Sequence, residues 1–231
     1  AIVLRVPREP AGRAEIEQLV PQPGWPELER ALAEQQPRRF FEVLRECDAL
    51  GRILPEIDAL FGVPQPPEHH PEIDTGVHTL LVLDEAVRRS DSARVRFAAL
   101  MHDLGKGTTP RAEWPRHIAH EERGVKIIEK LCERLRVPNE YRDLARLAAR
   151  YHTHCHRALE LRAATLLETL ESLDAFRRPE RLEEFLIACT ADFYGRPGYE
   201  AKPYPQADRF RAAFAAARAI DTAVVVAGKA G

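Results

Sequence analysis

The chain has 231 residues, of which 45% are hydrophobic and 30% are charged, a composition that is ordinary for a folded protein. No apolar run approaches the roughly 20 residues that cross a bilayer, and the N-terminus lacks a secretory signal pattern, so we expect a cytoplasmic protein. A formal net charge of −2 excludes a uniformly basic, nucleic-acid-binding surface. The four cysteines show no C-x-x-C spacing, which disfavours a disulfide framework or a structural zinc knuckle.

The two ends of the chain differ from the rest. Residues 1–26 hold five of the 18 prolines, which disfavours long helices, so we expect a poorly ordered lead-in. At the other end AVVV, residues 223–226, is the one stretch with some strand character. Because the chain begins at Ala1 rather than Met and lacks an obvious closing element, we expect a piece of a longer protein.

Between these ends, apolar residues recur at three- and four-residue steps, which is typical of helices that share a core. Gly51 is expected to end the second helix, and Ser92 or Asp91 to cap the helix that leads to residue 102. The helices are expected at 27–34, 38–50, 76–89, 95–101, 118–135, 139–151, 163–173, 179–193 and 206–219. We therefore predict an all-α fold with a lead-in (1–26), a helical neck and connector (27–70) and a helical domain (71–231).

The stretch AALMHDLGKG, residues 98–107, is the centre of the functional argument. His102 and Asp103 end an apolar helical segment, where a carboxylate costs several kcal/mol unless a metal or strong hydrogen bonds take up its charge. Lys106 follows between two glycines, and its ammonium could neutralise a bound phosphate, with Arg111 and Arg116 on the same loop. A solvated loop lysine is the alternative interpretation.

Two distant side chains could complete a metal site with this pair. His78 lies in the first turn of a predicted helix, and Asp192 falls on the apolar stripe of a later one. With His102 and Asp103 they form a mixed nitrogen and oxygen set that suits Ni, Mn, Mg, Co or Zn and leaves positions open for water and phosphate. The alternatives are an ordinary helical histidine at 78 and a buried hydrogen bond at 192.

The order His78, His102-Asp103, Asp192 resembles the HD superfamily of metal-dependent phosphohydrolases. The segments FFEVLRECDALGRILPEIDALFGVPQPPEHHPEIDTGVHTL, HDLGKG and WPRHIAHEERGVKIIEKLCERLRVPNEYRDLARL look more specifically like the C-terminal half of bacterial CCA-adding enzymes, from about residue 38 to the end. That resemblance implies an HD-domain helical bundle. It also implies metal-dependent hydrolysis of 2′,3′-cyclic phosphates, 2′-nucleotides and phosphomonoesters at tRNA 3′ ends, and leaves room for a homodimer.

The resemblance also assigns residues. By position, His78, His102, Asp103 and Asp192 would hold the metal, while His120 and His152 would be neighbours in the active site. His117 competes with His120 for that place, and the sequence does not separate them. His154 and His156 are expected in a wet turn. The catalytic set is therefore expected to be His102, Asp103, His120, His152 and Lys106, with Lys106, Arg111 and Arg116 binding substrate.

Two other functions remain open. The first is a non-catalytic body that binds tRNA or dimerises, using arginines as phosphate contacts. The candidate arginines are Arg142, Arg146, Arg150, Arg177, Arg178, Arg181, Arg209 and Arg211. The second is a free-standing HD nucleotide phosphohydrolase. The nucleotidyltransferase head of CCA-adding enzymes carries paired acidic residues on a sheet, and no such pattern is legible in these 231 residues.

Overall fold

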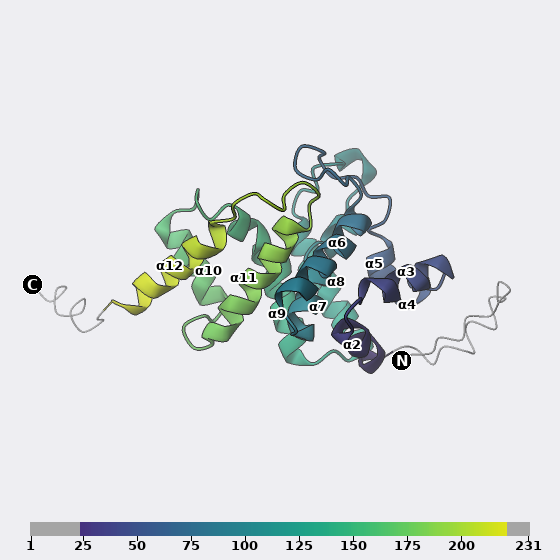
Figure 1. Ribbon diagram of the computed structural model, residues 1–231, viewed down its shortest axis with the longest axis horizontal. Helices are drawn as coiled ribbons and strands as arrows, with labels where there is room; N and C mark the ends of the chain where they lie inside the picture. Colours follow the sequence, from purple (N-terminus) through teal and green to yellow (C-terminus); the bar gives the residue numbers. More distant parts are fainter. Residues whose placement is uncertain (1–23, 221–231) are drawn as a thin grey trace, which may run out of the picture.

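The computed structural model describes residues 24–220, and between those positions the regular structure is helical, without a β-strand (Figure 1). The all-α prediction is therefore confirmed. The predicted lead-in up to residue 23 and the AVVV segment lie outside the described residues. The helices are α2 (Trp25–Ala33), α3 (Arg38–Glu46), α4 (Leu50–Ile53), α5 (Pro55–Asp58), α6 (Thr75–Arg89), α7 (Ala93–Met101), α8 (His120–Leu135), α9 (Asn139–His156), α10 (Ala163–Ser172), α11 (Pro179–Tyr194) and α12 (Gln206–Arg218), with 3₁₀ turns η1 (Leu104–Thr108) and η2 (Arg111–Glu113).

The starts of α6 and α7 follow from local chemistry. The side chain of Asp74 accepts a hydrogen bond from the Val77 amide at 2.9 Å and begins α6. Ser92 does the same for the Val95 amide at 3.4 Å and begins α7. Each cap satisfies an amide that would otherwise lack an acceptor in the first turn.

Three predicted helix boundaries are wrong. Gly51 does not end the second helix: α3 ends at Glu46, where Asp48 adopts a left-handed φ of 55°, and Gly51 lies inside the short α4. The residues YHTHCH are not a turn, because α9 continues to His156. The first helix starts at Trp25, two residues before its predicted start at residue 27.

Helix α7 is the central element. Every residue from Val95 to Met101 is buried, because α6, α9, α11 and α2 surround it. One hydrophobic cluster joins α2–α5 to α6–α8, and a second joins α9–α12 to α6 and α7. In Figure 1 the first group lies at the N-terminal end of the molecule and the second at the C-terminal end. The helix that leads into the His-Asp pair is thus held from all sides.

Trp25 fixes the neck on this core. Its ring packs edge-to-face on Phe97 of α7 at 5.4 Å between centroids and on Tyr141 of α9 at 4.5 Å. Such aromatic pairs add to the free energy that burial alone contributes. Within residues 24–220 no helix has the length and apolarity needed to span a membrane.

Replacing Phe97 with alanine should destabilise the fold by about 3–5 kcal/mol, because it leaves a cavity where two aromatic partners converge. The measurement is the free energy of unfolding in urea. Phe176→Ala is the matched control: that ring is 38% exposed, and its loss should cost clearly less. Equal losses in the two variants would contradict the central role of α7.

Candidate metal centre

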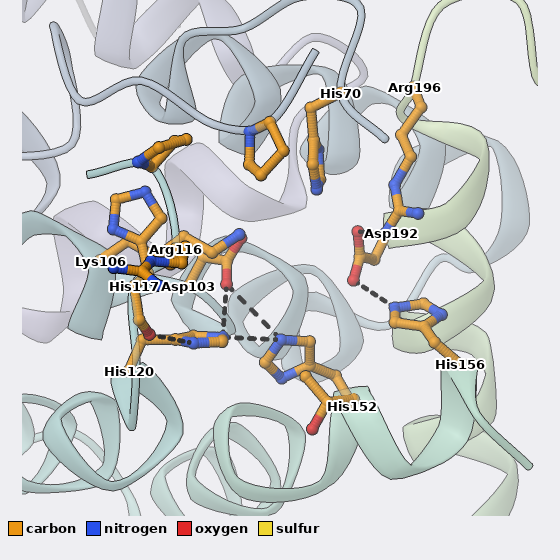
Figure 2. A pocket seen from close by; sticks show the side chains of 13 residues that line it. His70, Asp103, Lys106, Arg116, His117, His120, His152, His156, Asp192 and Arg196 are labelled. Carbon is orange, nitrogen blue, oxygen red and sulfur yellow. Dashed lines mark hydrogen bonds and ion pairs between the residues drawn. The ribbon is translucent and has the colours of Figure 1, made fainter. Parts of the chain in front are cut away.

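Five helices bring their polar side chains to one place. His102 and Asp103 follow α7 directly, His78 lies in the first turn of α6, and Asp192 lies in the last turn of α11. The start of α8 supplies His120, and the C-terminal part of α9 supplies the histidines at 152 and 156. Figure 2 shows Asp103, His120, His152, His156 and Asp192 directed toward a common cavity, which all five line. All the expected ligands are therefore brought together.

A glycine makes this convergence possible. Gly105 in η1 lies against the first turn of α8, and a Cβ there would overlap the backbone of His120 and of Gly124. The close approach sets His120 opposite Asp103. Gly105 is thus required by the close packing of η1 against α8.

The expected ligands and their histidine neighbours form two neighbouring groups of three, and His70, Glu72 and His78 form a third group. His78, His102 and Asp192 make the first, in which His78 Nε2 lies 3.1 Å from Asp192 Oδ1 and His102 Nε2 lies 3.7 Å from Asp192 Oδ2. In each group the candidate ligand atoms lie within 4.8 Å of one another.

Asp103, His120 and His152 make the second group, with both histidine Nε2 atoms at 3.4–3.5 Å from Asp103 Oδ1. The other oxygen of Asp103, Oδ2, lies 3.1 Å from His102 Nε2. Asp103 therefore lies between the two groups.

Hydrogen bonds to the backbone fix the protonation of three of these histidines. The Nδ1 atoms of His102, His120 and His152 lie 2.7–3.0 Å from the carbonyl oxygens of Ala99, His117 and Ala148. A carbonyl can only accept, so each Nδ1 carries the hydrogen and each neutral ring presents a lone pair at Nε2.

These lone pairs face other acceptors. His120 Nε2 and His152 Nε2 are 3.4 Å apart, and both face Asp103. Among residues 24–220, His102 Nε2 and Asp103 Oδ1 have no hydrogen-bond partner although both are buried. Buried acceptors that face one another are costly, and a cation between them removes the cost. The donor set, with histidine nitrogens and carboxylate oxygens, suits a divalent transition metal or magnesium.

The charges of the two carboxylates are also fixed by their surroundings. Burial acts to raise the pKa of Asp103, but the charges of His102 and Lys106 hold it well below the usual range. The pKa of Asp192 is likewise held low against burial, by His156, His102 and Arg196. Both side chains are therefore anionic at neutral pH.

The histidines differ from one another. Burial is the main reason why the pKa of His120 falls to about 4, so its ring is neutral and able to ligate. Burial also opposes charge on His102, but Asp103 and Asp192 raise its pKa. A proton can thus occupy His102 Nε2 until a metal displaces it.

A second layer of side chains orients the first, and sequence reasoning missed it. Glu72 Oε1 lies 2.7 Å from His78 Nδ1 and 3.0 Å from His70 Nδ1, and these contacts lower the pKa of Glu72 to about 2 although burial acts to raise it. His156 donates from Nε2 to Asp192 Oδ2 at 2.6 Å and accepts at Nδ1 from the Tyr204 hydroxyl at 2.9 Å.

Of these missed residues, His156 had a detectable signal. It lies four residues after His152, and that spacing puts both on one face of α9. The expectation that His156 sits in a wet turn is therefore wrong. Glu72 and His70 belong to an aperiodic connector, so no pattern placed them.

The three basic residues that were predicted to bind substrate lie in different environments. Lys106 is buried, because its Nζ contacts Asp103 Oδ2 at 2.6 Å and Gln65 Oε1 at 2.5 Å, which overturns the solvated alternative. Arg116 lines the cavity, whose volume is about 190 Å³. Arg111 does not line it and lies over the Trp114 ring instead.

His117 and His120 can now be separated. His117 lines the cavity too, but its ring nitrogens bind the Pro64 carbonyl at 2.8 Å and the Thr109 hydroxyl at 3.0 Å. His120 Nε2 is directed to Asp103 instead. The geometry therefore favours His120 as the member of the polar cluster.

A fold of helices that places a His-Asp pair among buried ligand candidates is that of the HD domain family, and the model of that family matches residues 75–192. The chain belongs to the HD domain family. The matched segment runs from the first residue of α6 to Asp192, and it contains all six members of the two ligand groups.

Several curated relatives are similar over almost the whole chain. A multifunctional CCA protein of Nitrosospira multiformis is 58% identical over 222 residues, which is 96% of this chain and 54% of the relative. That of Thioalkalivibrio sulfidiphilus is 60% identical over 213 residues, 92% of this chain and 52% of the relative. The chain spans about half the length of the curated relatives it matches. The resemblance to multifunctional CCA-adding enzymes is thereby confirmed.

Replacing Glu72 with glutamine should weaken binding of Mn²⁺ by about 10- to 100-fold, as is common when a carboxylate that orients a metal-ligating histidine is lost. Isothermal titration calorimetry measures this affinity directly. Glu68→Gln is the control, because Glu68 is exposed in the same connector. An unchanged Mn²⁺ affinity in Glu72→Gln would show that Glu72 does not act through His78.

Proposed function

We propose that this chain is a metal-dependent phosphohydrolase module of a multifunctional CCA protein. Its substrates would be 2′,3′-cyclic phosphates, 2′-nucleotides and other phosphomonoesters, and it would act in the cytoplasm in the maturation or repair of tRNA 3′ ends. The observation that carries the proposal is the buried set of histidine Nε2 atoms and carboxylate oxygens that face one another around Asp103. The names of the relatives support the assignment to tRNA.

The arrangement favours two ions over one. The expected set of His78, His102, Asp103 and Asp192 would be joined by His120 and His152, each group of three taking one ion. The two oxygens of Asp103 already face different groups, Oδ2 toward His102 and Oδ1 toward the other two histidines. A bound divalent ion lowers the pKa of a coordinated water and polarises a phosphoryl oxygen.

The other polar residues would prepare the site and receive the substrate. Lys106 Nζ uses two of its three hydrogens on Asp103 and Gln65, which leaves one for a phosphate oxygen. Arg116, exposed beside the cavity, would add positive charge at its entrance. His156 keeps a proton on Nε2 and thereby holds the orientation of Asp192.

The alternative of a non-catalytic tRNA-binding body receives less support. On α9, Arg142, Arg146 and Arg150 each pair with an acidic side chain at 2.8–3.3 Å. Arg177 and Arg211 pair with acidic side chains elsewhere, at 2.6 and 2.9 Å. Paired arginines offer a weaker field to a phosphate backbone. The similarity to CCA proteins favours a tRNA enzyme over a free-standing nucleotide phosphohydrolase. A homodimer is part of the proposal that rests on this resemblance, and light scattering would test it.

His102→Ala and Asp103→Ala should each lower hydrolysis of 2′,3′-cyclic AMP by at least about 100-fold, the scale of losing a catalytic group. The assay uses purified protein with Ni²⁺, Mn²⁺ or Mg²⁺ added, and circular dichroism confirms folding. His69→Ala is the control, because His69 is an exposed histidine of the connector. Undiminished hydrolysis in both folded variants would reject the proposal.

Metal analysis tests the two-ion arrangement separately. The wild-type protein should bind two equivalents of Mn²⁺, and the double variant His120→Ala/His152→Ala should bind one, because the first group of three remains intact. Inductively coupled plasma mass spectrometry after dialysis gives both numbers. One equivalent in the wild type would rule out the second ion.

A further inference from the structure

Three cationic side chains line the cavity, and they differ in how much of their charge is free. Lys106 lies between Asp103 and Gln65, and Arg116 is exposed at the entrance. Arg196, four residues after Asp192, is the third, and 14% of its side chain is exposed. It lies outside the segment that matches the HD family and has no part in the two ligand groups.

Arg196 is held in place but only partly used. One of its terminal nitrogens donates to Asp192 Oδ1 at 3.1 Å, and its guanidinium lies 5.8–5.9 Å from the ring centres of Tyr199 and Phe193. Its Nε atom is buried without a hydrogen-bond partner among residues 24–220. A guanidinium has five N–H donors, and leaving a buried one unused is unfavourable. The group therefore has donors available for a ligand.

The charge of the cavity points to the kind of ligand. The lining includes two carboxylates, Asp103 and Asp192, against the three cations. The walls thus carry excess positive charge even before a divalent ion is added. A dianionic ligand would offset this charge better than a neutral or singly charged one.

The size of the cavity limits how much of a ligand it can enclose. About 190 Å³ is less than the roughly 300–1,000 Å³ of pockets that surround a whole drug-sized molecule. A phosphoryl group fits such a space while the rest of a nucleotide stays outside. In Figure 2 Arg196 and His70 lie on the side of this space opposite His120 and His152.

We propose that Arg196 forms a subsite for a terminal phosphoryl group and makes the site prefer phosphomonoesters to cyclic phosphodiesters. The planar fork of a guanidinium matches two phosphate oxygens at once, which a lysine ammonium does not. A monoester has three terminal oxygens and two charges near neutral pH, whereas a 2′,3′-cyclic phosphate has two such oxygens and one charge. Loss of the guanidinium should therefore weaken binding of a monoester more than binding of a cyclic phosphate. The preference between substrates rests on the proposed hydrolase function, but phosphate binding itself does not.

The first experiment measures binding of inorganic phosphate to the Mn²⁺-loaded protein by calorimetry. Arg196→Gln should bind phosphate about 10- to 100-fold more weakly, as expected for a lost charged hydrogen bond, and Arg196→Lys should lie between it and the wild type. The matched control is Arg178→Gln, which removes another arginine that pairs with an aspartate four residues away, outside the cavity. It should bind phosphate like the wild type.

Binding of Mn²⁺, measured in the absence of phosphate, separates two roles for Arg196. If Arg196→Gln binds Mn²⁺ within about threefold of the wild type, the result supports a phosphoryl subsite. The roughly 10- to 100-fold loss of affinity would then concern phosphate alone, as expected for a hydrogen bond made to phosphate. A parallel loss of Mn²⁺ binding would overturn the proposal, because Arg196 would then act only by positioning Asp192. Unchanged phosphate binding in Arg196→Gln, or no phosphate binding by the wild type, would overturn it as well.

Kinetics then test the preference. In Arg196→Gln the KM for p-nitrophenyl phosphate should rise by about tenfold or more, and that for 2′,3′-cyclic AMP should rise less, with kcat changed less than KM in both cases. An equal rise for the two substrates would contradict the preference. If the wild type binds phosphate through Arg196 but hydrolyses neither compound, the proposed function fails and the subsite remains.

Discussion

The structure depends on one electrostatic constraint: acceptor atoms buried opposite acceptor atoms. Histidines at 102, 120 and 152 each give their Nδ1 hydrogen to a carbonyl three or four residues earlier, so their Nε2 atoms face the carboxylates of Asp103 and Asp192. Lys106 and Arg196 offset part of the charge of these carboxylates, and a cation between the facing acceptor atoms would remove the remaining repulsion. The surrounding core, with α7 enclosed on all sides, holds these groups in place. Packing of the helices thus keeps the acceptor atoms in an arrangement that suits a cation.

The members of the site have two origins along the chain. The six ligand candidates lie inside the segment that matches the HD family, whereas several groups that orient or anchor them lie outside it. Glu72 faces His78, Gln65 holds Lys106, and Tyr204 reaches His156. The family segment therefore supplies the six ligand candidates, and the flanking segments supply side chains that contact them.

Most of the helices and several site residues could be predicted from the sequence, because helices produce a periodic pattern of apolar residues. The stripe that contains Asp192 identified a carboxylate in the core, and the adjacent His-Asp pair marked the end of a buried helix. What the sequence did not reveal follows from geometry that has no period. Asp48 ends a helix through a left-handed backbone that any apolar pattern ignores, and the connector that carries Glu72 meets α6 only after the chain folds back. No sequence pattern distinguishes Arg196 from the other arginines, and only the fold shows that it lines the cavity.

The path of that connector has a thermodynamic consequence. Residues 63–74 touch the polar cluster at two points, through Gln65 on Lys106 and through Glu72 on His78, and their backbone is tied to the start of α6 by the bond from the Thr75 amide to the Val63 carbonyl. An ion held by His78 and Asp103 would therefore also order this segment. Linkage is reciprocal: if the ion changes the affinity of this segment for an outside contact by some factor, that contact changes the affinity of the site for the ion by the same factor. The neck of the molecule is thereby linked to its chemistry without touching a substrate.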